Sequence, residues 1–499
     1  MSNTQIDLEV VDAVVVGGGG AGLAAAVSAG TRGMQIVLLE KQAELGGTTR
    51  ISVGSWIAAC TRLQRRANIA DSADDFRADM EAFCGDMITL DDPKLRCLLA
   101  VESGVTVDWL EDLGVVFAGP FPDPVHRVNR MHNVMPGSRM YIAKLAKAAK
   151  RAGVTIRTRA SARDLVTDKR GNVVGLDYSD AKGQRRILAR RGIVLASGDF
   201  SGNREMRAAY LAPAAVAALP LNPDSMGDGH HIAQRAGAAL RNMDMVFGPL
   251  LRFSRLPKAG LTDRLPEWSW LARLLAQCLT RAPSWMLKPV INSLLITHMS
   301  PSDRLFKEGA LLVDLDGKRL NTAAAAASLA NARDVTGYIL LDQRIAELFT
   351  RYPYFLSTAP GIAYAYFHDY ARARPDIVHR GRTVQELAGK IGIPIESLRV
   401  ATEGLQHGAL FALGPVRAML TTTEGSLAID ESCRVLKEDG TPLEGLYAAG
   451  GAGQSGMPLR GHGLHIAWAM TTGRIAGEMI ARRVPVDLEE YSPAGQAKS

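Results

Sequence analysis

The glycine-rich stretch at residues 11–40, VDAVVVGGGGAGLAAAVSAGTRGMQIVLLE, most constrains what this chain can fold into. A short apolar strand at residues 13–16 leads directly into the glycines, and an alanine-rich helix follows them. A second apolar strand, at residues 36–39, ends in an acid, Glu40. This order of strand, glycine turn, helix and strand predicts a βαβ unit that binds a dinucleotide. The glycines at GxGxxG spacing are Gly17, Gly19 and Gly22.

Each part of this unit has a physical role toward the dinucleotide. The first two glycines allow a tight turn and a close approach of the backbone to a pyrophosphate, and the third lets the helix pack on the strand. The helix N-terminus adds free N–H groups and the positive end of a dipole. Glu40 stands about 20 residues after the first glycine, where a carboxylate can accept hydrogen bonds from both ribose hydroxyls. The same carboxylate would repel a 2′-phosphate, so NADP is disfavoured.

The residues that follow Glu40 indicate which dinucleotide is bound. Lys41 comes next, and residues 46–54 are mostly small or hydroxylic. Such residues let the backbone lie against a long, flat cofactor, and an extended FAD needs this second contact. We therefore expect FAD. A second GxGxxG between two further strands is absent, so NAD is not expected as the reductant.

Length and composition limit the remaining function classes. With 499 residues the chain is too long for one core, so two or three domains are expected. Its net charge of +7 arises without a long basic run, which argues against nucleic-acid binding. The five cysteines are scattered and no histidine cluster has ligand spacing, so neither a metal site nor a disulfide framework is expected. The first ten residues carry acids rather than a basic signal-peptide start, so a cytoplasmic location is expected.

An irregular polar and aromatic segment at residues 119–141 is a candidate wall of a substrate site. Loops rich in histidine, arginine and tyrosine are typical of binding sites, although a surface loop with incidental charges explains the composition equally well. We take three of its residues as candidate substrate contacts. These are His132, Arg139 and Tyr141.

A segment rich in Pro, Trp and Leu at residues 257–299 resembles an amphipathic helix pair. It could be a plain core-facing helix, a lid, an oligomer contact or a membrane-surface helix. Its tryptophans and arginines supply an apolar face and a basic rim. We therefore expect it to close over the substrate pocket and to allow a weak, peripheral contact with a membrane surface.

Two further segments carry candidate chemistry. Residues 359–370 place three tyrosines and a histidine together, which is unusual for a core helix. Near the C-terminus a strand at residues 446–450 leads into a glycine-rich stretch and then a helix at residues 464–481. That helix directs its N-terminal N–H groups at something negative, and in a flavoprotein the negative place is the N1/C2=O end of the reduced ring.

Six segments occur along the chain in a familiar order: VVVGGGGAGLAAAVSAGTRG, LLEKQAELGGTTRISVG, VLASGDFSGNREM, MGDGHHIAQRAGA, EGALLVDLDGKR and PLEGLYAAGGAGQSG…TTGRIAGE. In these segments the chain resembles the flavoprotein group that includes fumarate reductase and succinate dehydrogenase flavoprotein subunits and the 3-ketosteroid Δ1-dehydrogenases. The resemblance covers nearly the whole chain. It implies an α/β fold in which a Rossmann-like FAD-binding domain, residues 1–245 and 425–499, is split by an inserted α+β cap domain, residues 246–424.

The resemblance also implies which residues contact FAD. Covalent members of the group carry a histidine in the stretch that corresponds to residues 46–54, and this chain has none there, so we expect FAD to be bound non-covalently. The expected FAD-binding residues are Gly17, Gly19, Gly20, Ala21, Gly22, Glu40, Lys41, Gly46, Gly47, Thr48, Thr49, Gly54, Ala162, Ser197, Gly198, Asp228, Gly450, Leu464, His465 and Ile466.

Departures from the group's pattern bear on the substrate. Fumarate reductases carry a proton-donating arginine where this chain has Ala327 and a substrate histidine where it has Thr421. Ketosteroid dehydrogenases carry a tyrosine in the stretch that holds Ala327, and their YPGPG turn is LRGHG here. Arg460, which matches a substrate arginine of fumarate reductases, and His462 make this turn cationic, while residues 450–468 contain no acid. We infer a ketone substrate that also bears a carboxylate or another anionic group.

The first functional hypothesis is an FAD-dependent desaturase of a cyclic ketone, similar to ketosteroid Δ1-dehydrogenase and 4-oxocyclohexanecarboxylate desaturase. A base would remove the proton beside the carbonyl while hydride leaves the β-carbon for flavin N5. Tyr364 and Tyr366 are the candidate base and carbonyl donor, because a nearby Arg or His cation stabilises a phenolate. Arg460 and His462 complete the catalytic set, and Gly461 joins the substrate contacts. Each tyrosine could instead be a packed aromatic with a satisfied hydroxyl.

Two other functions remain open on the sequence. One is an enoate or enone reductase, which runs the same chemistry in reverse. A 3-ketosteroid dehydrogenase would be a variant of the first hypothesis and is not counted separately. The other is a non-catalytic flavin-binding partner or assembly subunit. In either catalytic case the small-molecule substrate is joined by an external redox partner, which for the desaturase is an electron acceptor such as oxygen, a quinone or a carrier.

Overall fold

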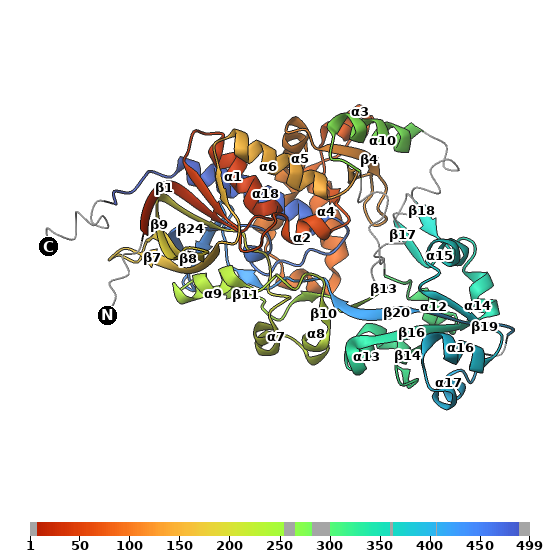
Figure 1. Cartoon of the computed structure of the whole chain (residues 1–499). Coiled ribbons are helices and arrows are strands. Elements are labelled where there is room, and N and C mark those ends of the chain that lie inside the picture. The colour runs from red at the N-terminus through yellow and green to blue at the C-terminus, as the bar shows by residue number, and fades with distance from the viewer. Residues whose placement is uncertain (1–6, 254–264, 282–299, 360–362, 406, 489–499) are drawn as a thin grey trace, which may run out of the picture.

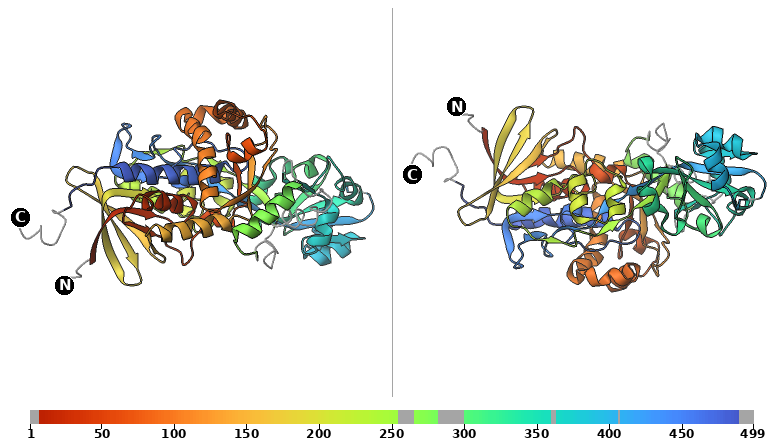
Figure 2. Two further views of the ribbon diagram at one scale, coloured as in Figure 1. Left: turned by 90° about the horizontal axis from the view of Figure 1, so that it is seen from above. Right: turned by 90° about the horizontal axis from the view of Figure 1, so that it is seen from below.

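The chain folds into a larger and a smaller lobe, which lie side by side in the computed structural model (Figure 1). The structure describes residues 7–253, 265–281, 300–359, 363–405 and 407–488. Views from above and below show the two lobes end to end (Figure 2). Among the described helices, none is both long and apolar enough to cross a membrane.

The larger lobe is built on an eight-stranded sheet with a parallel centre. β1 (Asp7–Val16) pairs in parallel with β2 (Ile36–Leu39) on one side and with β9 (Gly183–Leu195) on the other. β24 (Pro442–Ala448), from the far end of the chain, continues the parallel order beyond β9. β1 begins earlier than the predicted residue 13, because residues 7–11 pair with the first half of β9. The other strands are β6 (Thr155–Arg157), β7 (Ser161–Thr167), β8 (Val173–Asp180) and β23 (Arg434–Leu436).

Two helices from opposite ends of the chain pack closely against each other on this sheet. Every residue of α1 (Gly20–Gly30) is buried, and α18 (Leu464–Arg482) lies along it. A Cβ at Gly473 would stand 2.2 Å from the carbonyl oxygen of Ala21, and one at Gly477 would stand 2.3 Å from that of Ala25. Glycine is therefore required at both positions for the two backbones to touch.

A small three-stranded sheet lies beside these helices. Its strands are β3 (Ser55–Ile57), β4 (Val116–Phe121) and β5 (Met131–Met135), with β5 in the middle. The expectation of an irregular loop at residues 119–141 was therefore wrong for β5, where Met131, Val134 and Met135 are buried. The segment forms a strand because its apolar side chains are buried in the hydrophobic core.

The smaller lobe surrounds a seven-stranded sheet centred on one long strand, β20 (Leu410–Leu420). β20 pairs antiparallel with β16 (Thr336–Asp342), β13 (Leu250–Phe253) and β19 (Val378–Gly381). The remaining strands of this sheet are β10 (Leu219–Pro220), β14 (Leu311–Asp314) and β15 (Arg319–Leu320). All but β10 fall within the predicted cap range, whose limits stay a prediction. The Rossmann-like α/β class with a cap is confirmed.

A two-stranded ladder links the lobes. β12 (Val246–Phe247), which leads into the cap sheet, pairs antiparallel with β21 (Thr422–Thr423), which returns from it. The other short strand pairs are β11 (Leu240–Arg241) with β22 (Ser426–Leu427), and β17 (Ser357–Ala359) with β18 (Ala363–Ala365). The remaining α-helices are α2 (Gly47–Ile51), α3 (Arg62–Arg66), α4 (Ala73–Cys84), α5 (Pro93–Asp112), α6 (Arg139–Arg151), α7 (Arg204–Tyr210), α8 (Pro213–Ala217), α9 (Asp228–Arg235), α10 (Ser269–Arg281), α12 (Arg304–Lys307), α13 (Ala325–Ala330), α14 (Gln343–Leu348), α15 (Phe367–Ala373), α16 (Val384–Ile391) and α17 (Ile395–Ala401).

Candidate active site at the junction of the lobes

The glycine turn after β1 has the geometry of a dinucleotide cradle. Gly17 has a φ of +106°, and a Cβ there would lie 2.3 Å from the carbonyl oxygen of Ala196. A Cβ at Gly22 would lie 1.8 Å from the carbonyl oxygen of Gly17, so the third glycine is needed for helix and strand to pack, as predicted. The turn leads directly into α1, whose first N–H groups can bind a pyrophosphate.

Glu40 is held in place at the end of β2. Its Oε2 accepts a hydrogen bond from the Gly18 amide at 2.7 Å, and its Oε1 accepts one from the Gln42 amide at 2.7 Å. Each carboxylate oxygen keeps a second lone pair, which can accept from a ribose hydroxyl. The residues present here fit the adenosine half of FAD.

The other predicted FAD-binding residues before residue 230 gather at the same end of the sheet. Lys41 Nζ and Asp228 form an ion pair at 2.7 Å, and Thr49 Oγ1 accepts from the Gly20 amide at 3.3 Å. Ser197 Oγ accepts from the Gly229 amide at 3.0 Å and so ties the start of α9 to the end of β9.

Several members of the predicted set act through their backbone or their place in an element. Gly46, Gly47, Gly54 and Gly198 all have positive φ. Ala162 lies on β7. Thr48 Oγ1 accepts from Asn222 Nδ2 at 2.9 Å, a partner that the sequence did not suggest.

The C-terminal helix starts where the flavin half would lie. Gly463 has a φ of +77°, and a Cβ there would lie 2.7 Å from the Ser55 carbonyl oxygen, so α18 begins against β3. The Gly450 amide donates to Thr472 Oγ1 at 3.0 Å, which joins the end of β24 to the same helix. Leu464 is buried in the first turn of α18 and Ile466 is half-buried.

Arg460 lies in the turn before α18, in contact with the ladder between the lobes. Its Nη2 is 3.0 Å from Glu424 Oε2 and donates to the Val246 carbonyl oxygen at 3.0 Å. Its guanidinium carbon stands 5.3 Å from the ring centre of Phe247. The turn itself contains no acid, as the sequence showed, and the acid partner is Glu424, which directly follows β21.

Glu424 is a functional candidate that the sequence reasoning missed. It is fully buried, its Oε1 accepts from the Leu459 amide at 3.0 Å, and the same oxygen is 3.3 Å from His465 Nε2. Burial by itself raises the pKa of this carboxyl, but the hydrogen bond and charge of His465, the charge of Arg460 and the Leu459 amide together hold the pKa below its ordinary value. A lone acid in the run TTTEGS was the only signal in the sequence.

Other ionisable groups lie around this cluster. Asp199 follows β9, accepts a hydrogen bond from Thr422 Oγ1 and accepts one from Ser201 Oγ at 2.7 Å, and its burial raises its pKa. Arg252 on β13 donates to Thr421 Oγ1 at 3.2 Å, and burial lowers the pKa of its guanidinium. The junction therefore brings together two guanidiniums, two carboxyl groups and an imidazole.

His462 forms a second histidine–acid pair nearby. Its Nδ1 is 3.2 Å from Oδ1 of Asp123, a buried residue that the sequence reasoning did not select. The His462 side chain is 55% exposed. Gly461, between Arg460 and His462, has a φ of +115°.

The two candidate tyrosines lie on the cap, in β18 and at the start of α15 (Figure 1). Tyr364 packs on the rings of Tyr352 and Phe355 at 5.3 and 5.0 Å. Burial, followed by Tyr364 and Asp369, raises the pKa of Tyr366. The groups that change this pKa most do not include the cation that was expected to stabilise a Tyr366 phenolate. In the described part of the chain, no hydrogen bond joins either tyrosine to Arg460 or His462.

The three candidates from residues 119–141 all have partners within the fold. His132 is fully buried and shares a hydrogen bond with Thr61 Oγ1 at 2.9 Å, and burial lowers its pKa to about 4. Tyr141 is also fully buried, and its hydroxyl donates to the Gly54 carbonyl oxygen at 2.9 Å. Arg139 forms an ion pair with Glu267 at 3.0 Å. These contacts within the fold do not support a role in substrate binding, which stays a prediction for all three residues.

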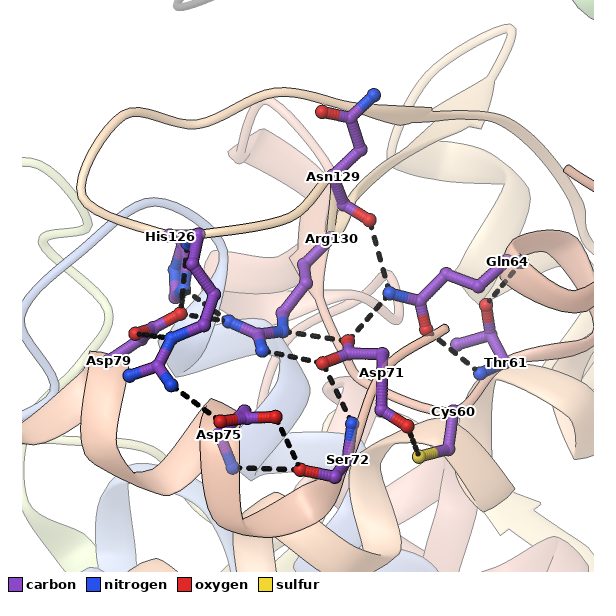
Figure 3. Close-up of polar contacts among 11 residues, drawn as sticks. Cys60, Thr61, Gln64, Asp71, Ser72, Asp75, Asp79, His126, Asn129 and Arg130 are labelled. Atoms are coloured by element: carbon purple, nitrogen blue, oxygen red, sulfur yellow. Dashed lines mark hydrogen bonds and ion pairs between the residues drawn. The ribbon is translucent and has the colours of Figure 1, made fainter. Parts of the chain in front are cut away.

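Arg130, the central cation of the same segment, is also structural. It is fully buried and forms two hydrogen bonds to Asp71, at 2.5 and 2.8 Å, and an ion pair with Asp79 (Figure 3). The same close-up shows His126 beside Asp79 and Gln64 bonded to Asp71. The network fixes the loop before β5 onto α4.

The structure describes only part of the segment at residues 257–299. Its described helix, α10, packs on β4 and β5 of the larger lobe. Ser269 Oγ donates to the Gly114 carbonyl oxygen at 2.8 Å. The predicted second helix and Trp285 lie outside the described residues, and closure of the segment over the substrate stays a prediction.

The comparisons with known proteins agree with this geometry. The FAD binding domain family matches residues 12–267 and 271–460, so the chain belongs to this family, and FAD is its cofactor. The fold is the one that FAD-binding flavoenzymes share, and the resemblance noted in the sequence is confirmed.

Individual relatives match over different lengths. The fumarate reductase (cytochrome) of Shewanella frigidimarina is 31% identical over 48% of this chain, and the match spans only 42% of that protein. The 4-oxocyclohexanecarboxylate 2-dehydrogenase of Sinomonas cyclohexanicum is 26% identical, over 94% of this chain and 92% of that protein. The open conformation of a flavocytochrome c3 fumarate reductase has a TM-score of 0.72 at 23% identity, covering 95% of this chain and 78% of that one, and shows the shared fold.

Proposed function

We propose that the protein is an FAD-dependent desaturase of a carbon–carbon bond beside a carbonyl group, in a cyclic ketone that also bears an anionic group such as a carboxylate. The observation that carries this proposal is the cluster at the junction of the lobes. There the buried Glu424 holds Arg460 and His465 together at the start of α18. The similarity to a 4-oxocyclohexanecarboxylate 2-dehydrogenase over nearly the full length of both proteins supports the same substrate class.

Arg460 is the proposed anchor of the substrate. A guanidinium keeps its charge and offers five N–H donors, whereas the contacts to Glu424 and Val246 use only Nη2. Its Nε is buried without a hydrogen-bond partner in the described part of the protein. A buried donor left open is costly, so an anionic or carbonyl oxygen of the substrate would satisfy it. Bound FAD supplies the hydride acceptor.

His462 is the proposed group that moves the α-proton. Because its Nδ1 faces Asp123, the tautomer with hydrogen on Nδ1 is favoured, which leaves Nε2 as the acceptor. The adjacent carboxylate would stabilise the imidazolium that forms. Tyr364 and Tyr366 remain alternative donors to the carbonyl oxygen, although the raised pKa of Tyr366 disfavours it as the base.

A second candidate function is the reverse reaction, reduction of an enoate or enone. The fumarate reductase relative, with 31% identity over about half the chain, favours it. In that direction the His462 imidazolium would give the proton that it takes in the first. Both functions use the same side chains, so direction must be measured.

Anaerobic flavin titration distinguishes these functions. A saturated cyclic keto acid should bleach the flavin absorbance if the protein is a desaturase, and a neutral keto-steroid should do so weakly because it offers Arg460 no anion. If only an enoate or enone, added to the chemically reduced protein, restores the absorbance, the protein is a reductase. A flavin that neither reaction changes would contradict both proposals and favour a non-catalytic role.

Replacing Arg460 by lysine tests the anchor. Arg460→Lys should keep the flavin spectrum but lower kcat/KM by about 100-fold or more, since a point charge replaces a planar fork. The matched control is Arg434→Lys. Arg434 lies on β23 and forms a half-exposed ion pair with Asp430, so this change should leave kcat/KM unchanged. An unchanged kcat/KM in Arg460→Lys would contradict the anchor, and Arg252→Lys, on β13 at the same junction, would then be measured in the same assay.

A further inference from the structure

The side of the larger lobe that carries α6 and α10 combines exposed aromatic rings with several basic side chains. Trp268 and Trp270, at the start of α10, are 56% and 62% exposed, and their rings stack with centres 5.8 Å apart. Leu274, one turn further along α10, is 51% exposed. Large apolar side chains gathered on a surface mark a site of contact with another apolar body.

Positive charge lies directly beside these rings. The basic residues of α6 and α10 on this side are Lys144, Lys147, Lys150, Arg151 and Arg273. In the part of the chain that the structure describes, none of the five forms an ion pair. A groove of about 490 Å³ on α6 has a floor of Ala143 and Ala146 and is edged by Lys147, Lys150 and Arg151.

The two helices lie close to each other at Gly114. A Cβ at Gly114 would stand 3.3 Å from Ser269 Oγ and 3.8 Å from Lys144 Cδ, so the aromatic and basic parts meet at this residue. Arg139, at the start of α6, bonds Glu267 and the Leu265 carbonyl oxygen and so fixes the approach to α10. Both helices appear on the upper side of the larger lobe in Figure 1. Glu267, the acid next to the rings, is neutralised by Arg139.

The positive charges also act on one another. Burial, and then the charges of Lys147 and Arg273, lower the pKa of Lys144. Like charges held this close repel, and an anionic partner would relieve the repulsion. The partner that the surface fits must therefore be both anionic and apolar.

We propose that this surface, defined by Trp268, Trp270 and Leu274 with the five basic residues, docks the protein on an anionic lipid bilayer. Tryptophan is favoured at the boundary between headgroups and acyl chains, because its ring is apolar and its N–H is polar. Lysine and arginine beside it bind the anionic headgroups, each strengthening the attachment about fivefold. The attachment is peripheral and does not depend on the proposed reaction.

Vesicle binding of the full-length, FAD-loaded protein tests the proposal. At low salt the protein should co-sediment with vesicles that contain about 30% phosphatidylglycerol, with a blue shift of tryptophan fluorescence, and should not bind pure phosphatidylcholine. About 0.5 M NaCl should release most of it, because the attraction of exposed charges is screened. Binding that is equal on both lipids, or no binding at all, would overturn the proposal.

Two variants and two controls assign the binding to this surface. The double variant Lys147→Glu with Lys150→Glu should weaken binding about tenfold or more. The double variant Trp268→Ala with Trp270→Ala should abolish the blue shift. Lys182→Glu, on the turn between β8 and β9, and Tyr352→Ala, an exposed aromatic of the cap, should bind as the unmodified protein does. Equal losses in Lys182→Glu would contradict the assignment.

Sedimentation without lipid separates the bilayer from another occupant. The protein should have the same mass with and without the two tryptophans. A dimer that Trp268→Ala with Trp270→Ala converts to a monomer would show that a second copy covers the surface, and the lipid proposal would then be rejected.

Discussion

Glu424 is a buried carboxylate that faces the guanidinium of Arg460 and the imidazole of His465. Arg460 and His465 approach its two oxygens, and the Leu459 amide donates to one of them. Transfer of such a charge from water costs several kcal/mol unless these partners are in place. The geometry of the candidate anchor thus depends on a residue that need not touch the substrate.

Removal of this charge should loosen the junction without disturbing the dinucleotide cradle. Glu424→Gln should lower the free energy of unfolding by about 3 kcal/mol, because Arg460 is left with an uncompensated buried charge. Urea unfolding measures the change, and the flavin spectrum should persist. Glu438→Gln, which alters an exposed ion pair with Arg241, should change stability by less than about 1 kcal/mol.

Burial of neutral histidines makes stability depend on pH. The pKa of His132 is lowered to about 4 from the ordinary 6.5, mainly by burial. Between these values the unfolded chain binds a proton that the folded protein does not, so stability is full above pH 6.5 and falls as the pH drops toward 4. The loss from this residue amounts to about 3 kcal/mol at most.

His132→Gln should remove that part of the pH dependence and keep a hydrogen bond to Thr61. Urea unfolding at several pH values should show a smaller loss on acidification than in the unmodified protein. His231→Gln, at an exposed position, should keep the original dependence. Because His132 has no contact with solvent, kcat/KM near neutral pH should be unchanged, and a large fall would support its substrate role.

For single residues, the sequence predicts the roles that depend on the spacing of neighbouring residues. Gly17, Gly22 and Glu40 could be assigned because their roles depend on neighbours within one βαβ unit. Glu424 and Asp123 could not, because each pairs with a histidine or arginine far away in the chain. The burial of His132 could not be predicted, because composition does not reveal which face of a strand enters a core.

At the scale of elements, glycines in α18 allow its backbone to touch the backbone of α1. A Cβ at Gly477 would overlap the carbonyl oxygen of Ala25. Ala25 belongs to α1, which is fully buried and therefore has no room to move away. Gly389 in α16 offers a contrast, since nothing lies within 4 Å of its Cβ position.

The same substitution at these two glycines should have opposite effects. Gly477→Ala should destabilise the protein by about 1–3 kcal/mol through overpacking. Gly389→Ala should stabilise it by about 0.5–1 kcal/mol, since alanine is the better helix former. Thermal unfolding of both variants checks the prediction. Equal effects would mean that helix propensity, and not contact between α1 and α18, governs Gly477.

Elements with strong local patterns were predictable from the sequence, and their partners were less so. The strand at residues 36–39 agrees with β2, and the helix predicted at residues 464–481 agrees with α18 to within one residue. β5 was missed because its apolar residues are interrupted by His132 and Asn133, which look like loop residues. Its pairing with β3 supplies a stability that no short window contains.

At the scale of the whole molecule, we expect the fold alone to retain FAD. Residues 46–54 contain no histidine to which the ring could be attached. Acid precipitation should therefore release yellow flavin into the supernatant, because unfolding removes every contact with it. Colour that stays in the pellet after washing would show a covalent link and contradict this expectation.

The order of elements along the chain also affects how the protein is made. β24 and α18 complete the first sheet and cover α1, yet a ribosome delivers them after all of the cap strands. During synthesis the apolar side of α1 therefore remains exposed, although the strands of the cap sheet can already pair. We expect the nascent chain to depend on chaperones during this interval, and a truncated product that ends before β24 to aggregate rather than acquire its cofactor.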